Sequence, residues 1–132
     1  MLLADWRFRL PKIEVVRKDQ LQTGHPTHGV VRNRAFETET IVLSQTQLDP
    51  GVVSGWHHHG ERHLYGFMIA GKLRLEYGEN GKEAVEVLPG DFFHIPPGLV
   101  HRDVNPEEEG KVVVLGIVVG LGPPVINVNG PG

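Results

Sequence analysis

The 132-residue sequence contains no cysteine, which excludes disulfide bonds and every thiolate site for a metal or a nucleophile. Its longest apolar run, Val112 to Val119, is far shorter than the roughly 20 residues that span a bilayer. A net charge of only −3 provides no basic surface for nucleic acid. The first ten residues include Asp5, Arg7 and Arg9 and do not resemble a secretion leader. These absences predict a cytoplasmic protein that binds neither membranes nor nucleic acid.

Long helices are not expected either, because 17 glycines and ten prolines interrupt the chain at short intervals. Between these breaks lie short apolar or alternating segments at 30–36, 40–48, 52–59, 64–69, 72–77, 85–88, 92–95, 100–104 and 111–119. About ten short strands at near-regular spacing predict an all-β sandwich or barrel. We expect one domain over 1–132, with its core at about 38–119, an edge strand or arm at 2–16 and an irregular tail from 120 onward.

Eight histidines are the most conspicuous polar feature of this chain. His57 and His59 lie two residues apart in a predicted strand, so their side chains point to one face and His58 points away. His101, just after the Pro97-Gly98 turn, is the natural third ligand. Neutral imidazole favours transition metals over calcium or magnesium, so we expect one divalent ion among Fe, Zn, Ni, Mn, Co and Cu.

At these residues the sequence resembles the cupin superfamily, whose two motifs are Gly-x5-His-x-His-x3–4-Glu-x6-Gly and Gly-x5-Pro-x-Gly-x2-His-x3-Asn. The residues that match are Gly51, His57, His59 and Gly71 in the first motif, and Gly90, Pro96, Gly98, His101 and Asn105 in the second. The resemblance implies a jelly-roll β-barrel, also called a double-stranded β-helix, with the metal inside its mouth.

The chain departs from this pattern at the glutamate of the first motif. Counting back from Gly71 places Leu64 there, whereas counting forward from His59 places His63 there. A β-bulge before Gly71 would absorb the extra residue. We favour His63 as a fourth metal ligand; the alternative is that His63 lies on the barrel rim and water is the fourth ligand. Glu61 is a weaker candidate.

Four further polar residues are candidates for the surroundings of the site. Asp103 shares a face with His101 and either orients a ligand or forms an ion pair with an arginine. His94 either lines the pocket or fills space. Arg32 and Arg34 share one strand face, where they bind an acidic substrate or simply cover the surface.

The function that these residues favour is that of a mononuclear metal oxidoreductase, a dioxygenase on a small organic substrate. The alternatives are a non-catalytic module that binds a small ligand and an isomerase or epimerase on a sugar-like substrate. The last is disfavoured because the obvious histidines are already assigned to the metal. Tyr65, Phe67 and Ile69 form an apolar row on one strand face, which predicts a homodimer.

Overall fold

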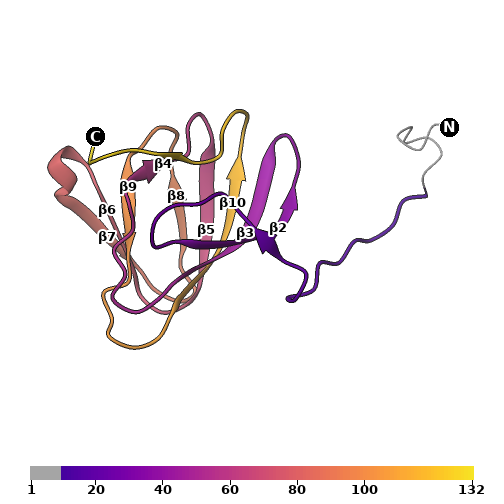
Figure 1. Ribbon diagram of the computed structural model, residues 1–132, viewed down its shortest axis with the longest axis horizontal. Coiled ribbons are helices and arrows are strands. Elements are labelled where there is room, and N and C mark those ends of the chain that lie inside the picture. The colour runs from indigo at the N-terminus through magenta and orange to yellow at the C-terminus, as the bar shows by residue number, and fades with distance from the viewer. Residues whose placement is uncertain (1–9) are drawn as a thin grey trace.

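The computed structural model describes residues 10–132, which fold into two antiparallel sheets that face each other as a jelly-roll barrel (Figure 1). The first sheet has the order β1 (Gln22–Thr23), β2 (Val31–Glu37), β3 (Ile41–Leu48), β10 (Val112–Val119), β5 (His63–Ala70) and β8 (Phe92–Ile95). The second has the order β11 (Ile126–Asn127), β4 (His57–His58), β9 (His101–Val104), β6 (Leu73–Tyr77) and β7 (Glu83–Val87). A 3-10 turn, η2 (Glu79–Gly81), precedes β7. Within residues 10–132, no helix has the length and apolar character needed to cross a bilayer.

The core lies between the two sheets and is formed by side chains that alternate along their strands. In β10, Val112 and Val114 are buried whereas Leu115 is exposed, as strand periodicity requires. The buried cluster consists of Leu48, Met68, Leu73, Leu75, Val87, Ile95, Val112 and Val114. Both sheets contribute to this cluster, so it fixes the separation of the two sheets, one of which carries the strands of His57 and His101.

Strand β5 shows which of its residues face the interior. Gly66 and Met68 are buried, while Tyr65 and Ile69 are about half exposed. The register against β10 shifts near the end of β5, so Ile69 is an extra, bulged residue. The bulge that the sequence suggested before Gly71 therefore exists, but it follows Met68 and leaves the alternation from His63 to Met68 unchanged.

Three segments can be compared with the sequence expectations: the N-terminal arm, the strand at 52–59 and the C-terminal tail. Residues 10–16 have no strand pairing and extend away from the sheets (Figure 1), and the rest of the expected 2–16 arm lies outside the described residues. The expected strand 52–59 is reduced to β4 and one bridge at Val53. The tail expected to be irregular contributes β11, which pairs with β4. The sheets thus extend beyond 38–119 at both ends.

Candidate metal centre

Three buried histidines converge between the sheets. His57 opens β4 and pairs in register with His101 at the start of β9, and His59 follows β4. Each is at most 2% exposed, and their candidate ligand nitrogens all lie within 4.8 Å of one another. The rings of His57 and His101 are 4.3 Å apart between centroids. The structure therefore brings together the three histidines that strand alternation and the motif spacing singled out.

Backbone carbonyl groups orient all three rings. Nδ1 lies 2.9 Å from the Gly55 oxygen in His57, 2.9 Å from the Pro124 oxygen in His59 and 2.8 Å from the Leu99 oxygen in His101. A carbonyl oxygen only accepts hydrogen bonds, so each Nδ1 carries the proton and donates it. The Nε2 lone pairs are left free, and such a second hydrogen bond typically fixes the tautomer and the ring of a metal-binding histidine.

Burial also keeps His57 and His59 in their ligand-competent, neutral form. It lowers the pKa of His57 to about 4, against a weaker opposing effect of the Asp103 carboxylate, and lowers the pKa of His59 to about 3. Burial alone would raise the pKa of Asp103, but His57, His101 and Arg32 outweigh it and hold that pKa below its usual value. At neutral pH the site therefore combines neutral His57 and His59 with an ionised carboxylate.

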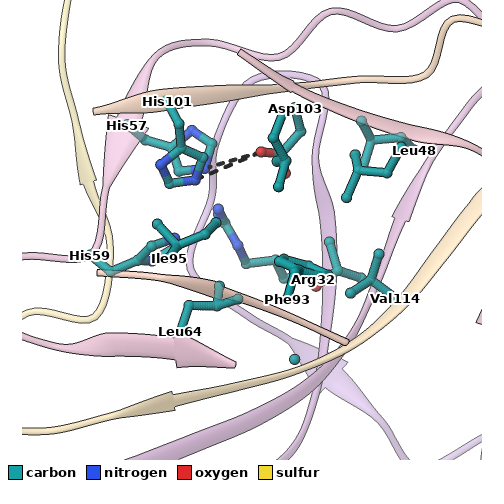
Figure 2. Close-up of a pocket in the computed structure, with 14 residues that line it drawn as sticks. Arg32, Leu48, His57, His59, Leu64, Phe93, Ile95, His101, Asp103 and Val114 are labelled. Carbon is teal, nitrogen blue, oxygen red and sulfur yellow. Dashed lines mark ion pairs between the residues drawn. The ribbon is translucent and has the colours of Figure 1, made fainter. Parts of the chain in front are cut away.

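Two buried polar atoms in this site have no hydrogen-bond partner. They are Nε2 of His59 and Oδ1 of Asp103. The Asp103 oxygen lies 3.8 Å from Nε2 of His57 and 3.8 Å from Nε2 of His101, as the dashed lines in Figure 2 indicate. Electron-rich atoms directed at one another without a donor are unfavourable unless a cation lies between them. The donor set therefore fits a divalent transition-metal ion.

His63 does not belong to this cluster, which corrects the expected fourth ligand. It is exposed on the outer face of β5, where its Nδ1 lies 2.9 Å from Nε2 of His94 and its ring stacks on Tyr65. Leu64 lines the cavity instead. The reason is strand alternation, because the bulge lies after Met68 and cannot turn His63 inward. Counting back from Gly71 gave the correct position.

Of the other polar candidates, Arg32 lies at the histidine cavity, whereas Arg34 and His94 lie outside it. Arg32 lines the histidine cavity, and its Nη1 donates to the His25 carbonyl at 2.8 Å and to Thr27 Oγ1 at 2.7 Å. Arg34 pairs instead with Glu37 at 2.8 Å, away from the cavity. His94 does not line the histidine cavity, but it lines a neighbouring cleft.

Two cavities border the histidines. The first, of about 40 Å³, is lined by all three histidines together with Arg32 and Asp103 (Figure 2). It has room for an ion and very small molecules only. The second is a cleft of about 300 Å³ and shares His101, Leu75 and Ile95 with the first. Its remaining lining residues are Tyr77, Val85, His94, Pro96 and Leu99. The cleft is mostly apolar and has the size of a site for a small organic molecule.

The Pro124 carbonyl is a functional contact that the sequence did not reveal. It orients His59 across 65 positions of the chain. A backbone group carries no side-chain signature, and only the pairing of β11 with β4 places it there.

The chain belongs to the cupin family, because the family model of the cupin domain matches residues 44–119, more than half of its length. A comparison with curated proteins finds no match.

Solved structures with the same fold include an uncharacterized conserved protein with a double-stranded β-helix domain from Klebsiella pneumoniae, at a TM-score of 0.69 and 18% identity, covering 91% of this chain and 99% of that one. KdgF from Halomonas sp. aligns at a TM-score of 0.63 and 20% identity, covering 83% of this chain and 96% of that one. Bacillus subtilis oxalate decarboxylase, which has Mn(II) centres, aligns at 0.67 and 21% identity over 83% of this chain. This chain spans only 31% of the length of that enzyme. Because all three identities are low, these likenesses show the shared fold alone.

Proposed function

We propose that this cupin is a mononuclear metal oxidoreductase, a dioxygenase acting on a small and largely apolar organic substrate. The observation that carries the proposal is the position of His101, which borders both the small histidine cavity and the substrate-sized cleft. When bound by the three histidines, an ion such as iron supplies a redox centre with open coordination positions. The chain itself holds the rings, excludes bulk water and presents the substrate.

The cleft supports a substrate with an apolar body. Leu75, Ile95 and Leu99 provide aliphatic contacts, and Tyr77 adds an aromatic ring with a polar end. The charges of Arg32 and Asp103 lie in the smaller cavity, where they offset each other rather than line the cleft. This placement argues against a role for Arg32 as the main anchor of an acidic substrate.

Oxygen consumption tests this proposal directly. Iron-loaded protein should consume oxygen with at least one member of a panel of small aromatic, diketone and thiol compounds, and His57→Ala should abolish this activity. Val85→Trp should raise KM by partly filling the cleft, since Val85 lines it and is 44% exposed. Val31→Trp on β2 is the matched control, because that valine is 51% exposed and lies outside the cleft.

Two other outcomes would replace the proposal. Saturable binding of panel compounds without oxygen uptake would indicate a non-catalytic binding module. Conversion of a sugar-like compound without oxygen uptake would indicate an isomerase, for which His94 at the cleft would be the first acid or base to examine.

A further inference from the structure

The histidine cavity lacks an acidic residue at the position where the first motif has glutamate. Leu64 occupies that position and lines the cavity with an apolar side chain. Three neutral histidines would leave a divalent ion with both of its charges uncompensated by the protein. Among the residues that line the cavity, Asp103 provides a carboxylate, and it comes from β9 in the opposite sheet.

The position of this carboxylate fits direct coordination. Two donor atoms that each lie about 2.1 Å from one ion are about 3.0 Å apart at a right angle and about 4.2 Å apart when opposite. Oδ1 of Asp103 lies 3.8 Å from Nε2 of both His57 and His101, inside this range for both rings. The set of ligand atoms within 4.8 Å of one another contains the three histidines without Asp103, so direct coordination requires the Asp103 side chain to move closer to His59. Figure 2 shows the carboxylate directed at these two rings.

The backbone holds Asp103 in place while its side chain stays free. Its amide donates to Ser54 Oγ at 2.8 Å, and its carbonyl accepts from the Ser54 amide at 2.8 Å. Oδ1 is buried and has no hydrogen-bond partner. Arg32 forms no ion pair with it within 4.0 Å, although both residues line the same cavity of the described chain. A purely structural aspartate would have satisfied this oxygen with a donor.

We propose that Asp103 is the fourth protein ligand of the metal and coordinates it through Oδ1, in place of the motif glutamate. The inference rests on the proposed metal-dependent function and deepens it. The centre then consists of three histidines and one aspartate, and the acidic ligand has moved from β5 to β9. With the acidic ligand on β9, the side of the cavity formed by Leu64 of β5 and Phe93 of β8 is apolar.

Cobalt(II) is a suitable probe because its visible absorption reports its ligands. Asp103→Asn keeps the shape of the side chain and removes its charge, while Asp49→Asn is the control, since Asp49 is an exposed acid on the loop after β3. We expect Asp103→Asn to weaken cobalt affinity at least about 10-fold in a chelator competition and to shift the cobalt bands. Asp49→Asn should change neither.

The folded state of each variant is checked by circular dichroism and thermal melting without metal. Asp103→Asn should keep a cooperative melt but melt at a lower temperature, because Arg32 in the same cavity loses the charge that offsets its own. Weaker affinity with unchanged cobalt bands would overturn the inference and leave Asp103 as a positioning residue. Unchanged affinity would overturn it too, as would a cobalt-bound structure with Oδ1 more than about 3 Å from the ion. If the unmodified protein binds no cobalt, the proposed function itself fails. If His57→Ala loses the metal while Asp103→Asn binds it as tightly as the unmodified protein, only the proposed role of Asp103 fails.

Discussion

Metal-free protein should lose stability as the pH falls from 7 to 5, because His57 and His59 are buried in neutral form. Burial lowers their pKa values to about 4 and about 3. In the unfolded chain both imidazoles titrate near pH 6.5. Between pH 7 and 5 the unfolded state therefore takes up protons that the folded state does not bind. Proton uptake by the unfolded state lowers the free energy of unfolding as the pH falls.

The expected loss is large for a domain of this size. Proton linkage over this pH window gives about 2 kcal/mol for each histidine and about 4 kcal/mol for the pair. Typical domains have an unfolding free energy of about 5–15 kcal/mol. Ordinary carboxylates titrate mainly below pH 5, so they contribute little within the window.

Urea denaturation in the presence of a chelator, at pH 7, 6 and 5, measures this loss. In His59→Gln the loss should be about half that of the original protein, whatever the absolute stability of the variant, because His57 is then the one remaining imidazole of the pair with a lowered pKa. His28→Gln should retain the full loss, since His28 is exposed. A loss below about 1 kcal/mol in the original protein, or equal losses in the two variants, would refute the reasoning.

Three further predictions concern the metal, the packing and the assembly. His101→Ala should sharply lower the metal content measured by elemental analysis while the circular dichroism of the barrel is retained; full occupancy would remove His101 from the site. Gly66→Ala should destabilise the fold by about 1–3 kcal/mol in urea denaturation, because a Cβ there would overlap the Phe93 ring. Gly116→Ala is the control, since Gly116 is the partner of Gly66 on β10 and a Cβ there meets no atom within 4 Å. Equal stabilities of the two variants would contradict this packing. Light scattering should give about twice the 14.6 kDa chain mass, reduced to one chain in Tyr65→Glu, because Tyr65 lies in the exposed apolar row on β5; a monomeric original protein would contradict the dimer.

Strand periodicity allowed much of this structure to be predicted from the sequence. Alternation predicts that Tyr65 and Ile69 share one face of their strand, and in the structure both are about half exposed while Gly66 and Met68 between them are buried. The same rule placed His57 and His59 on one face, where the structure brings them together with His101. Such rules succeed because each side chain's direction depends only on its own strand.

Predictions that depended on long-range contacts were less successful. His63 was favoured as a ligand because its spacing from His59 fits the motif, but the position of the bulge decides which residue faces inward, and that depends on pairing with β10. The role of Asp103 was open, since its distance to His57 depends on two strands meeting across the sheet. The tail gave no strand signal, because β11 has only two residues and is held by its partner β4 rather than by its own propensity.

The hydrogen bond between His59 and Pro124 has a consequence for the order of events during synthesis. Since Pro124 follows His59 by 65 positions, the ring of His59 cannot be fixed until almost the whole cupin domain has left the ribosome. Val128 then reinforces the contact by donating to the Trp56 carbonyl at 3.0 Å. A nascent chain that has exposed His57, His59 and even His101 still has one unoriented imidazole. The arrangement in which all three rings are oriented therefore forms only when the barrel is complete.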